Sequence, residues 1–330
     1  NTNNYGDIAI NRTISHFLKD YFIVDYLPYW SENDIFGSLY SKYKILYKII
    51  MKFSCLRDIF YLFFLKKRIK VSYEKVIIGG GELLSGHIGF NTAFYNIIKF
   101  FKKRSPIYVI GVNGNANLKK HLLKRYKKAL FFPAKIMVRD YFTKDVLKNE
   151  YGIDANVYPD VVFSYRLVEN DHDKEKKEGI IVLSPIEYWD EFGEYLGITC
   201  ESDFINFLIE KTLAKRSFDE KIVVAPTVDT DNGIARKIYK KLTTLPGINA
   251  SLEEFSSLED YIAILKRASI VVSCRMHGLI LALDYACTIE SIAFKNKLAV
   301  FKKEYQDNPI NISSITEKSR ESLFNLLNWW

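Results

Sequence analysis

Short apolar runs recur along the chain, and most of them end in glycine or in a charged residue. They lie at residues 75–78, 107–110, 135–138, 156–158, 180–183, 222–225, 269–273 and 290–294. Runs of this length, bounded by turn residues, predict buried β-strands. Between them, apolar positions recur at helical spacing, at residues 203–216, 233–245, 258–267 and 278–286. Strands that alternate with helices predict parallel sheets, whose ligand sites lie at the carboxyl ends of the strands.

One polar stretch interrupts this alternation. Residues 166–179 are dominated by charged side chains, and the strand and helix pattern restarts after them. A chain of 330 residues is also long enough for two domains. We therefore expect an N-terminal Rossmann-like domain at 1–168, a charged linker at 169–179, and a C-terminal Rossmann-like domain at 180–330 that ends in an amphipathic helix. This organisation predicts a GT-B-like α/β fold, in which two parallel sheets face an interdomain cleft.

The charge of the chain is uneven. Its net charge is +8, and residues 41–75 alone hold ten Lys and Arg side chains against two carboxylates, interleaved with Ile, Leu and Phe. No run without a charge is long enough to span a membrane. A basic, aromatic, amphipathic segment is typical of a contact with the membrane surface, and it is also compatible with a solvated basic face over a core helix. Nucleic-acid binding is not expected, because no recognised binding motif accompanies the charge.

The four cysteines show no CxxC spacing. They predict reduced thiols in a cytoplasmic protein, without a disulfide framework or a zinc site. No clustered ligand spacing predicts a metal, and no cofactor is expected. Because the chain opens at Asn1 rather than at Met, part of the natural amino terminus is expected to precede it.

The most informative motif is the end of one strand. Residues 268–276 read as a single buried strand that delivers Arg275 and His277, followed by Gly278 and a helical stretch. A guanidinium can bind a carboxylate or phosphate with two N–H groups, an imidazole can move a proton, and a helix N-terminus adds unpaired N–H groups. The pattern therefore predicts an anion site. The alternative is that Arg275 forms a structural salt bridge and His277 caps the helix.

Five short motifs occur along the chain, and their order is as informative as the motifs themselves. They are Asn4-Tyr5-Gly6-Asp7, the glycines Gly79–Gly81, Arg139-Asp140 followed by Thr143 as an expected helix N-cap, Pro159-Asp160, and Ser273–Gly278 with Lys297 after the next strand. Together they resemble the polysaccharide pyruvyl transferase family over essentially the whole chain. The Ser-x-Arg-x-His-Gly element with a downstream lysine is the most specific part of this resemblance.

The resemblance implies transfer of the enolpyruvyl group of phosphoenolpyruvate to two hydroxyls of a sugar in a cell-surface polysaccharide precursor. The products are a cyclic pyruvate ketal and phosphate. A donor with a carboxylate and a phosphate needs at least two fixed cations. We expect its site to comprise Arg139 from the first domain and Arg275, Met276, His277 and Lys297 from the second.

The remaining roles concern protons and the acceptor. The expected catalytic residues are His277, Arg275 and Asp7. His277 is the favoured general acid or base, with phosphate binding as its alternative role. Asp7 is expected in a Gly-Asp turn, where it either assists catalysis by orienting a sugar hydroxyl or holds the loop as an Asx turn. Asp140 and Asp160 are expected to be structural; the alternative for Asp160, as for Asp7, is a share in the protonation of the donor carbon. The expected acceptor residues are Asn4, Gly6, Asp7, Gly80 and Gly81.

The chain departs from the family pattern after the His-Gly element. Ala286-Cys287-Thr288 stands where Gly-x-Pro is common, and Phe294 stands in place of a tyrosine. Lys295 competes with Lys297 for the role of the downstream lysine, although spacing favours Lys297.

Two other functions remain open. One is a GT-B glycosyltransferase with a nucleotide-sugar donor, for which only Glu290 is placed to hold a ribose. The other is a non-catalytic scaffold at the membrane surface. If residues 41–75 touch the bilayer, a lipid-linked saccharide at the cytoplasmic face of the membrane is the natural acceptor.

Overall fold

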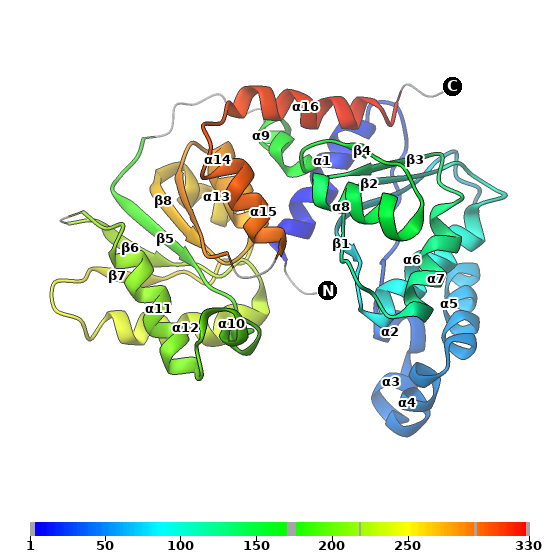
Figure 1. Cartoon of the computed structure of the whole chain (residues 1–330), viewed down its shortest axis with the longest axis horizontal. Helices are drawn as coiled ribbons and strands as arrows, with labels where there is room; N and C mark the ends of the chain where they lie inside the picture. The colour runs from blue at the N-terminus through cyan, green and yellow to red at the C-terminus, as the bar shows by residue number, and fades with distance from the viewer. Residues whose placement is uncertain (1–3, 170–175, 218, 294–295, 328–330) are drawn as a thin grey trace. The chain divides into compact units, whose positions relative to one another are not determined.

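The computed structural model describes residues 4–169, 176–217, 219–293 and 296–327 (Figure 1). It contains two parallel sheets, with strand orders β1-β2-β3-β4 and β7-β6-β5-β8-β9. The prediction of two parallel α/β sheets is therefore confirmed. The chain divides into two compact units. Unit 1 comprises residues 1–16 and 161–320, and unit 2 comprises residues 17–160 and 321–330.

Unit 2 contains the four-stranded sheet. Its strands are β1 (Val76–Leu84), β2 (Ile107–Gly114), β3 (Lys135–Val138) and β4 (Asn156–Val157). Its helices are α2 (Glu32–Phe36), α3 (Ser38–Lys42), α4 (Lys44–Lys52), α5 (Ser54–Arg68), α6 (Ile88–Phe101), α7 (Lys120–Leu130), α8 (Tyr141–Val146) and the π-helix η1 (Leu147–Tyr151). Helices α5, α6 and α7 lie side by side (Figure 1), and Phe94, Val109 and Tyr126 are among the buried residues of this core.

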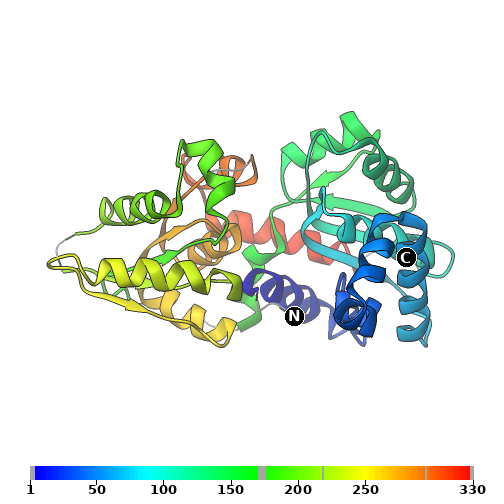
Figure 2. The same ribbon diagram turned by 90° about the horizontal axis from the view of Figure 1, so that it is seen from below.

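Unit 1 contains the five-stranded sheet. Its strands are β5 (Ile180–Ser184), β6 (Lys221–Val224), β7 (Ala250–Leu252), β8 (Ala268–Ser273) and β9 (Thr288–Ser291). Its helices are α1 (Tyr5–Leu18), α9 (Arg166–Glu169), α10 (Trp189–Leu196), α11 (Glu201–Leu213), α12 (Asn232–Leu242), α13 (Leu258–Arg267), α14 (Met276–Asp284), α15 (Asn296–Tyr305) and α16 (Ile312–Phe324), with the short 3₁₀ helices η2 (Val161–Ser164) and η3 (Asp229–Asp231). Helices α11 and α12 pack side by side (Figures 1 and 2).

The units differ from the expected domains 1–168 and 180–330. The start of α1 belongs to unit 1 because it is tied there: the Tyr5 amide donates to the Thr227 carbonyl (3.1 Å), and the Tyr5 hydroxyl donates to the Phe255 carbonyl (2.6 Å). The C-terminal helix α16 is present as expected, but the chain from Glu321 onward groups with unit 2. Residues 166–169 of the polar stretch form α9, and residues 170–175 of the expected linker lie outside the described residues.

Two local predictions need correction. The segment 268–276 is not one strand: β8 ends at Ser273, and α14 begins at Met276. Thr143 is not a helix N-cap either, because Asp140 holds that position and its carboxylate accepts the Thr143 amide at 2.6 Å. The π-helix η1 ends at Gly152, which adopts φ +70°, the left-handed conformation that glycine accepts most readily.

Candidate functional site

The carboxyl edge of the unit 1 sheet gathers the residues of the candidate site. Strands β6, β5 and β8 are neighbours in this sheet. Glu187 follows β5, Thr227 and Asp231 follow β6, and Arg275 follows β8. In parallel sheets this edge is where ligands bind.

Arg275 is held by Asp231 through a two-point ion pair. Its Nε donates to Asp231 Oδ2 at 2.9 Å, and its Nη2 donates to Oδ1 at 2.7 Å. Asp231 is fully buried and also accepts the Glu187 amide at 3.0 Å. The alternative that Arg275 forms a structural salt bridge is thus correct for one edge of the guanidinium. Its Nη1 contacts no acceptor among the described residues, and the side chain is 23% exposed.

The turn between β8 and α14 explains why serine and glycine stand in this motif. Ser273 Oγ accepts the Arg275 amide (2.9 Å) and donates to the Arg275 carbonyl (3.1 Å). A Cβ at Gly278 would lie 3.2 Å from both Ser273 Oγ and the Tyr261 hydroxyl oxygen, which is tighter than ordinary van der Waals contact. The motif therefore fixes the backbone that presents Arg275 and His277.

His277 lies in the first turn of α14, half-buried. It does not cap the helix, because the N-cap position is Arg275. The N–H groups of the first helical turn lack acceptors within the helix. Arg275 makes no side-chain cap to them, which leaves this helix end suited to an anion.

The opening motif of the chain packs against His277. Asn4 forms an isolated antiparallel bridge with Val228, and Gly6 is buried so closely against the imidazole that an added Cβ would come within 2.9 Å of its Nδ1, Cγ and Cβ atoms. The Gly-Asp pair is not in a turn as expected but in the first turn of α1. Exposed Asp7 accepts the Asn4 side-chain amide at 3.0 Å. The expected catalytic and acceptor residues Asp7, Asn4 and Gly6 thus belong to the same unit as His277.

Tyr5 illustrates how firmly this segment is anchored. Burial raises the pKa of its hydroxyl to about 12, and the carboxylates of Asp229 and Asp260 add to the rise. The hydroxyl therefore stays protonated and keeps its hydrogen bond to the Phe255 carbonyl. The start of α1 is fixed beside the sheet edge from which His277 emerges.

In unit 2, Arg139 lies in a buried polar cluster. Its Nη1 is 3.1 Å from Asp160 Oδ2, and its Nε is 3.9 Å from Asp140 Oδ2. Asn113 donates to both Asp140 (2.7 Å) and Thr143 Oγ1 (3.0 Å). The aspartates are structural partners, as expected, and Arg139 is 6% exposed. Its role as a donor ligand, together with the unit 1 residues, stays a prediction.

The three glycines do not follow a strand; they lie within β1. Gly80 and Gly81 have φ of +66° and +78°, and Gly111 of the neighbouring strand β2, which lies between the partners of Gly79 and Gly81, has φ +65°. An added Cβ at Gly81 would meet nothing within 4 Å. Glycine is therefore required here for its backbone conformation at a strand irregularity. The role of Gly80 and Gly81 in acceptor binding stays a prediction.

The remaining expected site residues follow strands β8 and β9 of the unit 1 sheet. Met276 is buried at the start of α14, and Lys297 lies half-buried in the first turn of α15, after β9. Lys295 lies outside the described residues, so the choice between the two lysines stays open. Glu290, the candidate ribose ligand of the glycosyltransferase alternative, forms an ion pair with Lys215 at 2.8 Å.

Sequence reasoning missed Asp231 and Glu187. The Glu187 carboxylate accepts the Ile234 amide at 2.9 Å near the start of α12, and its backbone N–H binds Asp231. The signal that was available is the acidic turn at residues 229–231, which follows the strand at 222–225 and so meets the same sheet edge as Arg275.

These two parallel α/β units belong to the GT-B class, and that prediction is confirmed; the interdomain cleft stays a prediction. S. aureus MnaA, solved with UDP, superposes with a TM-score of 0.52 at 11% identity, covering 98% of this chain and 92% of its own. UDP-GlcNAc 2-epimerase from Neisseria meningitidis, bound to UDP-GlcNAc, gives a TM-score of 0.47 at 12% identity over 84% of this chain and 81% of its own.

The expected donor and acceptor residues, apart from Lys297, lie within a more specific match. The family model of the polysaccharide pyruvyl transferases matches residues 4–287, and the chain belongs to this family. A search of curated proteins found no match.

Proposed function

We propose that the protein transfers the enolpyruvyl group of phosphoenolpyruvate to two hydroxyls of a sugar in a polysaccharide precursor. The observation that carries this proposal is the Arg275–Asp231 pair beside His277. Asp231 fixes the plane of the guanidinium. Nη1 contacts no acceptor among the described residues and is therefore available to a ligand. This arrangement supports recognition of a small anion, and family membership supports the donor.

The donor is a carboxylate and a phosphate on three carbons, so it needs cations in defined positions. The open edge of Arg275 suits one anionic group, and the N–H groups of the first turn of α14 suit the other. Lys297, in the first turn of α15, supplies a further point charge at the same sheet edge. Because two hydrogen bonds to Asp231 hold the Arg275 guanidinium in the absence of substrate, the guanidinium is already oriented before the donor binds.

Ketal formation adds one proton to the donor and removes one from each of the two sugar hydroxyls, and His277 is the residue that we assign to this proton transfer. Protonation of the methylene carbon makes C2 electrophilic, and the first sugar hydroxyl adds there and loses its proton. Departure of phosphate from C2 then allows the second hydroxyl to add with loss of its proton, which yields the cyclic ketal and phosphate. His277 is the general acid or base in this scheme. Asp7, exposed at the start of α1, orients a hydroxyl or takes its proton.

The decisive experiment measures products with two kinds of donor. The protein is incubated with a saccharide pool and phosphoenolpyruvate, and mass spectrometry seeks saccharides that have gained a pyruvate ketal while inorganic phosphate is released. In parallel it is incubated with nucleotide sugars. Release of nucleotide without release of phosphate from phosphoenolpyruvate would replace this proposal with the glycosyltransferase alternative.

We also propose that residues 41–75 contact the cytoplasmic face of an anionic membrane. Ile45 of α4 is 79% exposed, and Phe63 of α5, 67% exposed, lies one turn before the basic end of that helix at Lys66, Lys67 and Arg68. Exposed apolar side chains next to clustered cations are suited to a charged bilayer surface. A lipid-linked saccharide is then the natural acceptor. Among the helices described, none is long and apolar enough to cross a membrane.

A further inference from the structure

A second charged region of unit 2 lies outside the proposed transfer site. Residues 83–138 contain eleven Lys and Arg side chains and no Asp or Glu. This span includes α6 and α7, which pack against each other. Cations of this segment can be paired only by carboxylates from elsewhere in the fold, as Arg125 is by Asp58 at 2.6 Å, and cations that stay unpaired favour an anionic ligand.

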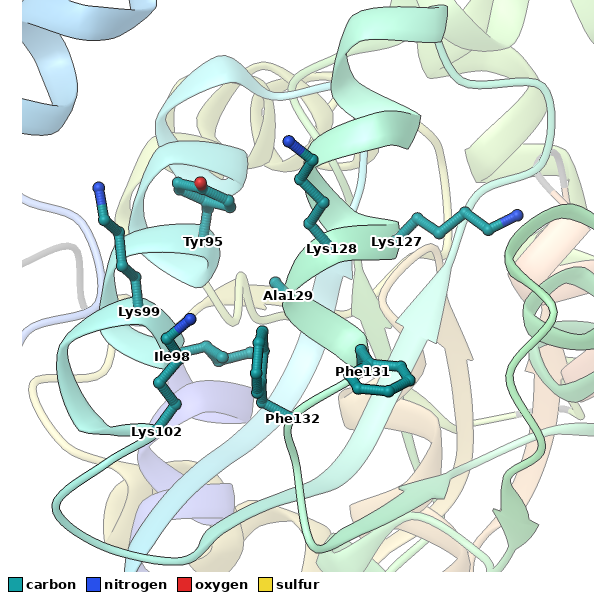
Figure 3. Close-up of a pocket in the computed structure, with 9 residues that line it drawn as sticks. All are labelled: Tyr95, Ile98, Lys99, Lys102, Lys127, Lys128, Ala129, Phe131 and Phe132. Carbon is teal, nitrogen blue, oxygen red and sulfur yellow. The ribbon is translucent and has the colours of Figure 1, made fainter.

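A pocket lies between the C-terminal ends of these two helices (Figure 3). Its volume is about 500 Å³, within the range of small-molecule sites. The lining residues are Tyr95, Ile98, Lys99, Lys102, Lys127, Lys128, Ala129, Phe131 and Phe132. Because α6 and α7 lead into β2 and β3, this pocket lies by the amino ends of these strands, opposite the edge of the unit 2 sheet that holds Asp140.

The pocket combines cations with an apolar wall. Lys99 and Lys102 stand on the α6 side and Lys128 on the α7 side, while Lys127 points away (Figure 3). Within the described residues, none of these four ammonium groups has a carboxylate within ion-pair distance. Lys102 Nζ lies 4.0 Å from the centre of the Phe132 ring, so the ammonium group and the aromatic wall of the pocket form a cation–π contact.

Helix dipoles explain only part of this arrangement. Lysines in the last turn of a helix are favoured by the negative end of its dipole, and Lys99 and Lys128 hold such positions. The dipole gives no reason for the two consecutive phenylalanines after α7, of which Phe131 is 78% exposed and Phe132 is 44% exposed. Exposed aromatic rings beside unpaired cations fit a ligand with both an apolar and an anionic part.

We infer that this pocket binds a phosphate ester attached to an apolar or planar body. The lysines act as point charges for the phosphate, and the body packs on Phe132, Ala129 and Ile98. Two sources share this chemistry, the head of an anionic lipid and a soluble nucleotide. The inference is independent of the proposed transfer reaction, since it uses none of the residues at the carboxyl edge of the unit 1 sheet.

The test is calorimetric titration of the full chain with three probes: dihexanoyl phosphatidic acid below its micelle concentration, ADP, and inorganic phosphate. We expect at least one of the two organic phosphates to bind and inorganic phosphate to bind about tenfold more weakly or not at all, because it lacks the body. The double variant Lys102→Gln/Lys128→Gln should weaken binding of the organic phosphate about tenfold or more. Phe132→Ala should weaken it without changing the net charge.

The matched control is Lys240→Gln/Lys303→Gln, which removes the same charge from exposed positions of unit 1. It should bind as the wild type does. Binding of the lipid probe alone identifies a lipid head as the source, and binding of ADP alone identifies a nucleotide. Failure of both organic probes to bind, binding that survives the pocket variants, or equal weakening in the control would each overturn the inference.

Discussion

Gly6 and His277 are joined by a contact that leaves no room for a side chain. The buried first turn of α1 lies so close to the imidazole that a Cβ at Gly6 would overlap Nδ1, Cγ and Cβ of His277. Two motifs from opposite ends of unit 1 thereby form one structure. The glycine of the opening motif sets the orientation of the histidine in the Arg-x-His-Gly motif.

We expect Gly6→Ala to reduce ketal formation about a hundredfold, because the added methyl group must displace the imidazole from its position. Thermal unfolding should change far less than activity. The matched control is Gly86→Ala, at an exposed position where an added Cβ would meet nothing within 4 Å. If Gly6→Ala transfers at the wild-type rate, the contact with Gly6 does not position His277 for the reaction.

The second prediction concerns the charge pair of Arg275 and Asp231. Arg275→Ala would leave the fully buried Asp231 carboxylate without its partner, at a cost of about 3 kcal/mol in the free energy of unfolding. The double variant Arg275→Ala/Asp231→Asn should recover much of this stability, because the buried charge is then gone. Transfer should stay abolished in both variants, since neither retains the guanidinium.

Urea unfolding and phosphate release from phosphoenolpyruvate are measured on the same preparations of these variants. Arg275→Lys is the informative comparison, because it keeps the charge and loses the planar fork. Activity that recovers together with stability in the double variant would show that Arg275 serves the fold alone.

The third prediction isolates proton transfer. His277→Gln should lower turnover about a thousandfold, because an amide can accept and donate hydrogen bonds but cannot act as a general acid or base. His277 is half-buried in the first turn of α14, so we expect the unfolding temperature to remain close to that of the wild type. Turnover near the wild-type rate in His277→Gln, with phosphate release measured under saturating phosphoenolpyruvate, would reduce the role of His277 to phosphate binding.

The sequence predicts the strands well, because each core strand is a continuous apolar run that ends in glycine or charge, as in β5 and β8. It does not predict where α1 packs. The hydrogen bond from Tyr5 to Thr227 joins distant parts of the chain, and no local pattern encodes it. The same holds for the Arg275–Asp231 pair, which forms only when β6 and β8 lie in one sheet.

The glycine run is a motif that the sequence reveals but whose place in the fold it does not. The run Gly79–Gly81 is visible in the sequence, yet it lies within β1, where Gly79 pairs with Ile110 and Gly81 with Val112, and both strands take positive φ between these pairs, at Gly80 and Gly111. Apolar spacing predicts that a strand ends before such a run. The structure shows that the strand continues through it with an irregular register.

The last prediction tests the proposed membrane contact. Reversing the charges of Lys66, Lys67 and Arg68 to Glu should weaken binding to anionic vesicles about a hundredfold, since each cation near such a surface contributes about 1 kcal/mol. The variant Ile45→Ser/Phe63→Ser should also reduce binding, because it removes exposed apolar area without changing the charge. All five substituted residues are exposed, so the unfolding temperature of both variants should change little.

Flotation with phosphatidylglycerol vesicles measures this binding, and phosphatidylcholine vesicles provide the neutral reference. The control Lys211→Glu/Lys240→Glu/Lys303→Glu makes the same change in net charge on unit 1. If it releases the protein as well as the α5 variant does, binding reflects overall charge and residues 41–75 are not the contact. Release by the α5 variant alone, together with the effect of Ile45→Ser/Phe63→Ser, locates the contact on α4 and α5, where apolar side chains and cations occur together.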